Sequence, residues 1–245
     1  MPVRILGEVI CKSALNLDEY VVVDVETTGM KAETQDIIEL GALRVRQGQV
    51  EAEFSSLVCL EKTRYLPAFI TDLTGITAQM LAAGGRPLDE VMAGFLSFAG
   101  DWPLVGHNVI FDCRFLQAAL EYCNERRELR GREALPALNN RVFDTLRMAR
   151  VLYKGACHRL GELAALLRVD NQGAHRALKD CYMAHGVLQK MMLHPEWAKW
   201  FAQRRGWVKK SVRRGGNGEG AAPESGSAQG MIQGYLDNDE AAAEG

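Results

Sequence analysis

The sequence of 245 residues predicts an α/β domain in which a mixed β-sheet is covered by helices. Three apolar or alternating segments, at residues 20–26, 37–45 and 50–58, predict strands, and a hairpin signal between the second and third favours an antiparallel meander. Beyond residue 100, short apolar segments alternate with longer stretches that carry apolar residues at helical spacing. A meander followed by alternating strands and helices is typical of a mixed sheet with helices on its faces.

The meander is expected to come first along the chain. Its first strand carries the apolar run Tyr20-Val21-Val22-Val23. The connection Gln47-Gly48-Gln49 predicts a tight hairpin between the second and third strands, because glycine adopts the backbone angles that such turns require. After the meander, residues 67–75 are expected to form turns and a short helix, and residues 77–83 and 88–98 carry apolar residues at helical spacing.

Short strands and helices are then expected to alternate. They are, in order, a strand at 103–106, a helix at about 109–123, a polar connection at 124–140 made of a helix end and a loop, a strand at 141–144, a helix to 151, and helices at 160–167 and 177–192. Each helix assignment rests on apolar residues three and four positions apart, which line one side of a helix. Asn108 directly precedes one of these helices and is expected to cap it.

We expect one domain at residues 18–207, between a leader at residues 1–17 and a flexible tail at residues 208–245. The tail contains a segment rich in Gly, Ala, Ser and Glu, with too few apolar groups to order itself. Its last part, from Gln229 to Leu236, is a small apolar island. Such an island either folds on contact with a partner or belongs to an ordinary disordered terminus, and both alternatives stay open.

The composition favours a soluble protein of a reducing compartment. Lys and Arg number 29 against 31 Asp and Glu, a net charge of −2, so any binding of nucleic acid must be local. The six cysteines lack paired spacing, which argues against a structural zinc site and a disulfide framework. Apolar segments are too short to span a bilayer. We therefore expect a cytoplasmic protein with no membrane partner.

Two acidic residues at the end of the first strand give the strongest indication of chemistry. Side chains alternate between the faces of a strand, so Asp24 and Glu26 point the same way and Val25 points the other way. Two carboxylates held this close repel each other unless a cation lies between them. The pair therefore indicates a site for a divalent metal, and the alternative is a solvated strand end with two acids.

Two later segments place further acids near helix starts. In Gly106-His107-Asn108-Val109-Ile110-Phe111-Asp112, a strand-ending glycine precedes a helix, and Asp112 falls in its first turns. His175 and Asp180 lie five positions apart, about 140° around an ideal helix, so they cannot both face one point from mid-helix. His175 is therefore expected in the loop or first turn before the helix that carries Asp180. Taken singly, each is more typical of a solvated acid or a surface histidine.

Together and in this order, the three motifs resemble those of the DnaQ-like 3′-5′ exonucleases, the DEDDh group of the ribonuclease H-like superfamily. The matching segments are Asp24 to Gly29, Gly106 to Asp112, and His175 with Asp180. The resemblance covers about residues 18–192. It implies a ribonuclease H-like mixed sheet flanked by helices, similar to the epsilon chain of DNA polymerase III and to the proofreading domain of other replicative polymerases.

The resemblance also implies a two-metal hydrolase. Four carboxylates would hold two divalent ions, Mg²⁺ or Mn²⁺, which prefer hard oxygen ligands: Asp24, Glu26, Asp112 and Asp180. Two such ions can clamp the attacking water and the leaving 3′-oxygen of a phosphodiester. His175 would act as general base, since imidazole titrates near neutral pH. The products would be nucleoside 5′-monophosphates released from a 3′ end.

Six further residues are candidates for contacts to the terminal nucleotide: Thr27, Thr28, Gly29, Thr74, His107 and Phe111. The first three lie where the chain leaves the strand, and ordinary turn chemistry explains them equally well. The fourth belongs to another family-like segment, Leu73 to Ile76. The ring of Phe111 can stack on a base or belong to the core. His107 can contact the substrate or pack against the residues of its own motif.

Three functions follow as alternatives. The first is a 3′-5′ exonuclease acting on DNA 3′ ends in proofreading or repair. The second is an RNA 3′ exonuclease similar to ribonuclease T or oligoribonuclease, because no residue decides which sugar is accepted. The third, a catalytically silent nucleic-acid or polymerase-binding scaffold, is disfavoured because every acid and the histidine are present. The segment from Gln229 to Leu236 loosely resembles a sliding-clamp-binding peptide, so a clamp or DNA polymerase is a further expected partner.

Overall fold

The computed structural model describes residues 17–171, 175–204 and 206–208. Within them, five strands form one sheet in the order β3-β2-β1-β4-β5. The strands are β1 (Glu19–Thr27), β2 (Ile37–Arg46), β3 (Gln49–Leu57), β4 (Leu104–Gly106) and β5 (Val142–Asp144). Strands β1, β2 and β3 pair antiparallel, whereas β4 pairs parallel to both β1 and β5. The prediction of a mixed sheet with an antiparallel meander is confirmed.

Eight helices lie among the described residues. They are α1 (Ala68–Thr74), α2 (Ala78–Gly84), α3 (Leu88–Ala99), α4 (Val109–Leu129), α5 (Thr145–Leu152), α6 (Leu160–Leu167), α7 (Ala177–Met192) and α8 (Trp197–Ala202). The bounds of α6 and α7 agree with the sequence prediction. None of the described helices is both long enough and apolar enough to cross a lipid bilayer.

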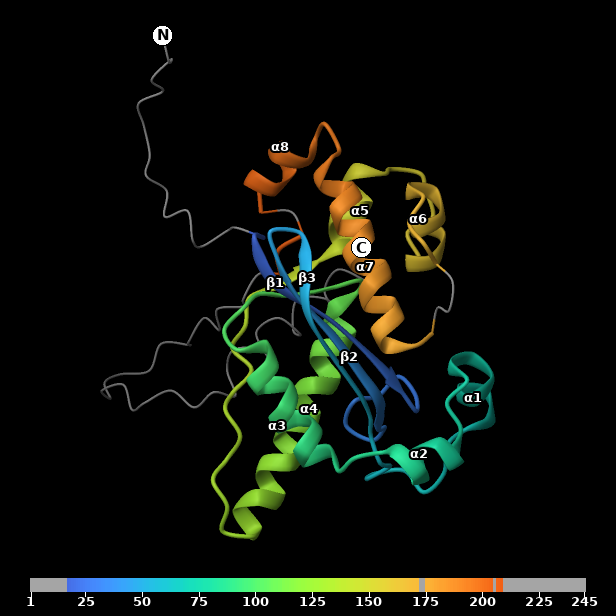
Figure 1. The fold of residues 1–245 in the computed structure, drawn as a ribbon, viewed down its shortest axis with the longest axis vertical. Helices are drawn as coiled ribbons and strands as arrows, with labels where there is room; N and C mark the ends of the chain where they lie inside the picture. Colours follow the sequence, from blue (N-terminus) through green and yellow to red (C-terminus); the bar gives the residue numbers. More distant parts are fainter. Residues whose placement is uncertain (1–16, 172–174, 205, 209–245) are drawn as a thin grey trace, which may run out of the picture.

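Helices cover both faces of the sheet (Figure 1). Helices α3 and α4 pack on one face and α7 on the other, with α5 and α6 beside α7. The residues of β1 alternate between the two cores: Val21 and Val23 pack with α3 and α4, whereas Tyr20 and Val22 pack with α5, α6 and α7. Because both faces of β1 are buried, an almost continuous apolar run is what this strand requires.

The predicted hairpin between β2 and β3 is confirmed, and its turn has two residues. Arg46 pairs with Gln49, and both Gln47 (φ 50°) and Gly48 (φ 76°) adopt positive φ. This combination is typical of the type I′ turn, whose twist matches that of the strands. The Gly48 carbonyl accepts a hydrogen bond from Gln189 Nε2 at 2.7 Å, so the hairpin is also fastened to α7.

Two local details differ from the sequence prediction, the capping by Asn108 and the last helix. Asn108 occupies the N-cap position of α4 with φ 64°, but its side chain makes no cap hydrogen bond; its backbone N–H instead donates to Asp144 Oδ1 at 3.0 Å. Helix α4 continues six residues past Cys123, to Leu129, so the helix end expected within the polar connection lies there. The sequence prediction also lacked α8. The expected clamp-binding segment at residues 229–236 and most of the expected leader lie outside the described residues.

Candidate active site

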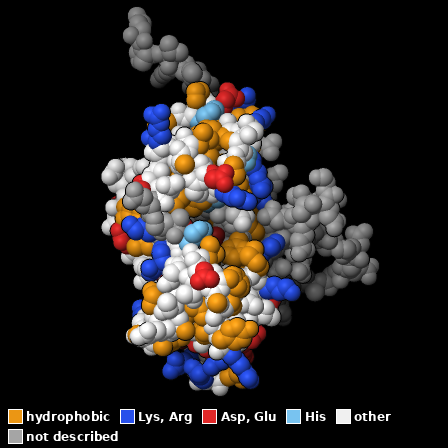
Figure 2. Space-filling view, turned by 90° about the vertical axis from the view of Figure 1, so that its right-hand side faces the viewer, with side chains coloured by type: hydrophobic (Ala, Val, Ile, Leu, Met, Phe, Trp, Pro, Cys, Tyr) orange, Lys and Arg blue, Asp and Glu red, His pale blue; other side chains and the backbone are white. Residues whose placement is uncertain are grey.

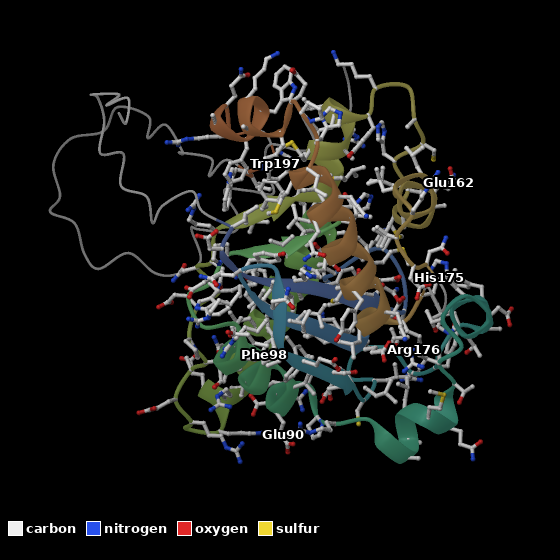
Figure 3. All side chains as sticks on the ribbon, turned by 45° about the horizontal axis from the view of Figure 1, so that its top comes forward. Glu90, Phe98, Glu162, His175, Arg176 and Trp197 are labelled. Atoms are coloured by element: carbon white, nitrogen blue, oxygen red, sulfur yellow. The ribbon has the colours of Figure 1, made fainter. Side chains whose placement is uncertain are left out.

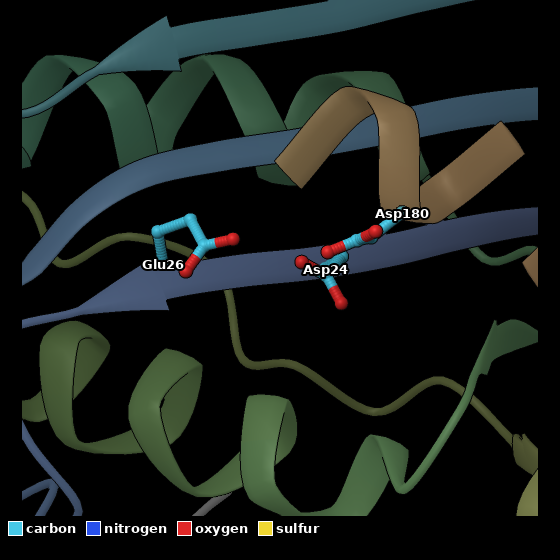
Figure 4. A group of neighbouring side chains, drawn as sticks. All are labelled: Asp24, Glu26 and Asp180. Atoms are coloured by element: carbon cyan, nitrogen blue, oxygen red, sulfur yellow. The ribbon is translucent and has the colours of Figure 1, made fainter. Parts of the chain in front are cut away.

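Three carboxylates converge where β1 meets the first turn of α7 (Figure 4). Asp24 and Glu26 project from β1, and Asp180 comes from α7. Each of the three carboxylates has one oxygen atom that lies within 4.8 Å of one oxygen atom in each of the other two. Val25, between the two strand acids, packs into the core formed with α3 and α4. The predicted alternation along the strand is therefore confirmed. Asp180 of the third motif lies beside Asp24 and Glu26 of the first.

The second motif reaches the same place through Asp112 on α4. Its Oδ1 accepts a hydrogen bond from the backbone N–H of Val25 at 3.0 Å, and its side chain is buried. Its charge raises the pKa of Asp24, so the two carboxylates interact, although Asp112 is not one of the three whose oxygens converge. All four predicted acids are thus gathered at one end of β1.

Burial and mutual repulsion raise the pKa of all four carboxyls. Burial is the largest cause in each. The pKa of Glu26 is raised to about 8 in total: burial and the charges of Asp180 and Glu39 raise it, and the charge of Arg176 lowers it. Keeping all four of these acids ionised together is unfavourable unless a cation compensates their charge. The electrostatics therefore fit a site for positively charged metal.

The donor set also matches a hard divalent cation. The converging group consists of carboxylate oxygens, the ligands that Mg²⁺ and Mn²⁺ prefer. The nearest thiol in sequence, Cys181, is turned away: its Sγ donates to the Gly41 carbonyl at 3.3 Å. Burial raises the pKa of this thiol well above its usual range, so it stays protonated rather than offering a soft thiolate.

His175 lies two residues before α7, as the sequence predicted (Figure 3). Its backbone adopts φ 68° and its residue is exposed. The His175 N–H donates to Asp180 Oδ2 at 3.1 Å. This bond holds the backbone of His175 at the carboxylate cluster while the imidazole remains open to solvent, which is the arrangement that a proton acceptor for an incoming water needs.

Two residues at the site were missed by the sequence reasoning. Glu39 on β2 is opposite Glu26 in the strand register and is only 2% exposed. Arg176 donates to both of its oxygens, through Nε at 3.2 and 3.1 Å and through Nη2 at 2.7 Å. A charged residue inside the apolar segment Ile37-Ile38-Glu39-Leu40 is the signal that could have found this pair, because a buried charge requires a partner.

The hydroxyls of the three threonines proposed to contact substrate are engaged within the protein. Thr27 Oγ1 donates to the Gly29 carbonyl at 2.7 Å. Thr28 Oγ1 donates to Gln35 Oε1 at 2.7 Å and accepts from the Asp36 N–H at 2.9 Å. Thr74 Oγ1 donates to the Ile70 carbonyl at 2.8 Å. Such bonds are the ordinary turn chemistry weighed as the alternative, and contact of the threonines with substrate stays a prediction.

His107 and Phe111 are likewise bound into the fold. The ring nitrogens of His107 lie 2.9 Å from Thr145 Oγ1 and 2.7 Å from the His158 carbonyl, and burial lowers its pKa. Phe111 is half-buried, with its ring centroid 5.0 Å from that of Phe115. These contacts are made within the protein, and contact of either residue with substrate remains a prediction.

On the face that Figure 2 shows, the basic side chains of the described residues do not form one continuous patch. Figure 2 shows the molecule from the side on which α1 and α6 lie in Figure 1, and Lys and Arg are scattered there among apolar and acidic groups. This agrees with the small net charge of −2. Attraction of a polyanion over this face is therefore local.

The chain matches known exonucleases in sequence. A family model described as Exonuclease matches residues 21–188. The PolC-type DNA polymerase III of Latilactobacillus sakei is 39% identical over 176 residues, which cover 71% of this chain and 11% of that protein. The chain thus spans about a tenth of the length of the curated relatives it matches.

Solved structures share the fold. Exonuclease X in complex with 5′ overhanging duplex DNA superposes with a TM-score of 0.56 at 24% identity, covering 75% of this chain and 98% of that one. The zinc-ion-bound form of the E. coli ExoI–ssDNA complex gives a TM-score of 0.62 at 19% identity, covering 76% and 43%. The ribonuclease H-like fold is confirmed. Since the matched region contains the whole carboxylate cluster and His175, the chain belongs to the Exonuclease family.

Proposed function

We propose that this chain is a metal-dependent 3′-5′ exonuclease that releases nucleoside 5′-monophosphates from DNA. The observation that carries the proposal is the convergence of Asp24, Glu26 and Asp180, beside Asp112 and His175, within a segment that matches the Exonuclease family. These residues supply oxygen ligands and a proton acceptor, the two requirements of metal-assisted hydrolysis of a phosphodiester.

Two divalent ions, Mg²⁺ or Mn²⁺, are proposed to be held by the four carboxylates. The crowding of these acids supports the ligand set, and the ExoI–ssDNA complex of E. coli is described as a zinc-ion-bound form, so a protein of this fold binds a divalent cation. When bound, the ions would stabilise charge on the attacking and leaving oxygens. The protein contributes the fixed placement of its ligands: two on β1, one on α4 and one on α7.

His175 is proposed to take the proton of the attacking water at one of its ring nitrogens. Its exposed side chain supports this role, since a water and the end of a strand must reach it from solvent. The bond from its N–H to Asp180 keeps the base near a ligand carboxylate. The terminal nucleotide is proposed to lie against the turn at residues 27–29 and the ring of Phe111, with Thr74 and His107 shaping this surface.

DNA is proposed as the substrate, in proofreading or repair within the cytoplasm. The relative from Latilactobacillus sakei is a DNA polymerase, and exonuclease X is described in complex with duplex DNA. A domain at residues 18–207 would carry the activity, and the segment at residues 229–236 would recruit a polymerase or clamp. Comparing recovery of a clamp or polymerase by the full chain and by a chain cut after Lys210 tests the recruitment; equal recovery would rule it out.

Matched single-stranded DNA and RNA substrates, labelled at the 5′ end, test the substrate and the direction. In Mg²⁺, DNA is expected to shorten one nucleotide at a time from its 3′ end, faster than RNA. A 3′-phosphate should block the reaction, because the last nucleotide is then no longer received as a free end. Faster digestion of RNA would favour the second sequence-based alternative, and digestion of neither polymer would contradict the proposed activity.

A further inference from the structure

The ion pair between Arg176 and Glu39 joins the start of α7 to the first residues of β2. Beyond the three hydrogen bonds from the guanidinium, the backbone N–H of Ala177 donates to Glu39 Oε2 at 3.0 Å. Glu39 therefore receives bonds from two consecutive residues at the helix start. Residues 39 and 176 are far apart in the chain, so this contact exists only once α7 has docked on β2.

The docking is close enough to need a glycine. A Cβ atom on Gly41 would lie 2.5 Å from the backbone carbon of Ala177 and 2.5 Å from the nitrogen of Leu178. Gly41 is opposite Asp24 in the strand register, and Glu39 is opposite Glu26. The first turn of α7 therefore rests on β2 at the two positions that neighbour the metal-site acids of β1.

This contact determines where the reactive groups of α7 stand. Arg176 is the single residue between His175 and the helix, and Asp180 lies one turn further on. Figure 3 shows His175 and Arg176 side by side at this end of α7. A rotation or lift of the first turn would move the base and one metal ligand together relative to β1. A planar guanidinium that donates two parallel bonds resists such a movement better than a single point charge.

The charges of Glu39 and Arg176 also affect the carboxyl groups of β1. Glu39 is a fifth buried carboxylate whose charge raises the pKa of Asp24 and of Glu26, and the charge of Arg176 opposes the effect on Glu26. Removing the guanidinium would leave Glu39 buried and uncompensated, which is strongly unfavourable. A charge-keeping substitution therefore separates the geometric role of Arg176 from the electrostatic one.

We propose that Arg176, fixed by Glu39, is a positioning residue for the hydrolysis: its two-pronged bond seats the first turn of α7 on β2 so that His175 and Asp180 face Asp24 and Glu26. This inference rests on the proposed nuclease function. It assigns no contact of Arg176 with substrate or metal. It requires that turnover depends on the two parallel hydrogen bonds of the guanidinium fork, and not only on its positive charge.

Arg176→Lys in the full chain tests the fork. Lysine keeps the charge but cannot donate two parallel bonds, so kcat on single-stranded DNA in Mg²⁺ is expected to fall roughly 10- to 100-fold, with KM within about 2-fold, because small displacements of a catalytic group cost rate. Mn²⁺ affinity, read from the paramagnetic signal of free Mn²⁺, and the melting temperature should stay close to those of the unaltered protein. Arg86→Gln, in the exposed pair with Glu90, is the control and should change neither kcat nor KM.

Amide hydrogen exchange, followed by NMR, tests the contact between Arg176 and Glu39 independently of turnover. In Arg176→Lys the amides of His175 and Ala177 are expected to exchange at least about 10-fold faster, because their bonds to Asp180 and Glu39 open more often. Unchanged exchange, or an unchanged kcat in an active enzyme, would overturn the inference. If the unaltered protein fails to digest DNA but amide exchange is still faster in Arg176→Lys, the proposed function is wrong. The contact between Arg176 and Glu39 is then a feature of the fold only.

Charge removal completes the test. Arg176→Gln should lower the melting temperature, and adding Glu39→Gln should restore most of that loss because no unpaired charge remains buried. The double variant should nevertheless keep the low kcat. Recovery of kcat in the double variant would show that charge balance alone explains Arg176, and would overturn the positioning role.

Discussion

The carboxylate of Asp112, on α4, accepts a hydrogen bond from the backbone N–H of Val25, on β1, at 3.0 Å. Asp112 is thus bonded to the residue that separates Asp24 from Glu26 in the strand. One oxygen of Asp112 is used to hold α4 against the end of β1, where its burial also raises its pKa. The residue therefore has a structural bond and a proposed ligand role at once, and the two can be separated by substitution.

Asp112→Asn should keep the structural bond and lose the activity. The amide carbonyl can still accept from Val25, and removal of a buried carboxylate relieves repulsion, so the melting temperature in EDTA should equal or exceed that of the unaltered protein. Nuclease activity should fall at least about 100-fold, because an amide is a poor ligand for a hard cation. Asp112→Ala is the comparison: it leaves the Val25 N–H without its partner and should cost about 1–3 kcal/mol. Full activity of the asparagine variant would refute the ligand role.

The metal-free protein should lose stability as pH rises. The folded pKa of Glu26 is raised from 4.5 to about 8, so stability linked to this group is complete below about pH 4.5 and is lost as pH rises towards 8. Together with its neighbours, this should lower the free energy of unfolding by on the order of a few kcal/mol between pH 5 and pH 9. Thermal melts in EDTA measure it. Glu26→Gln should flatten the dependence, and Mg²⁺ should stabilise the unaltered protein most at high pH; a melting temperature that climbs from pH 5 to pH 9 would contradict the argument.

Gly41→Ala should be destabilising because the added methyl would meet the backbone of α7 at 2.5 Å. We expect a loss of about 1–3 kcal/mol in denaturant unfolding, as is usual for overpacking, together with reduced nuclease activity from displacement of α7. Gly161 in α6 offers a matched control, since a Cβ there would meet nothing within 4 Å. Gly161→Ala should be neutral or stabilising by about 0.5–1 kcal/mol. Similar behaviour of the two variants would argue against close docking on β2.

His107→Ala should affect stability more than substrate binding. Both ring nitrogens are engaged with α5 and the loop before α6, so their removal should cost about 1–3 kcal/mol. The KM for DNA should change less than about 2-fold. Urea unfolding and steady-state kinetics on the same preparation check this. A raised KM with unchanged stability would show that His107 touches the substrate after all.

The sequence was most informative where its signals were local. The strands of the meander, α6 and α7 were predicted well because their hydrophobic periodicity is strong and their turns use glycine. The last residue of α4 could not be fixed from the sequence, because its last turns are highly charged and fit a helix end as well as a loop. In the structure Arg127 Nη1 donates to both oxygens of Asp89 in α3 at 2.8 Å, and this tertiary contact supports the extra turns.

The predicted acids of the site could be found from motif spacing, but their support could not. Asp24 and Glu26 share a strand face by simple alternation, whereas the pairing of Glu39 with Arg176 joins residues 137 positions apart. The same holds for the bond between Asp112 and Val25. Likewise, Thr27, Thr28 and Thr74 were visible as motif residues, but only the tertiary structure reveals that their hydroxyls bond to neighbouring backbone and side chains.

The most direct measurement is release of labelled nucleotide from 3′-labelled single-stranded DNA by the full chain, with Mg²⁺ or with EDTA, beside the variant Asp24→Asn. The account predicts labelled nucleoside 5′-monophosphate in Mg²⁺, none in EDTA, and at least about a 100-fold slower reaction for the variant, because one carboxylate of the converging three is lost. Equal release with and without EDTA, or by the variant and the unaltered protein, would contradict the claim that these carboxylates form a metal-dependent nuclease site.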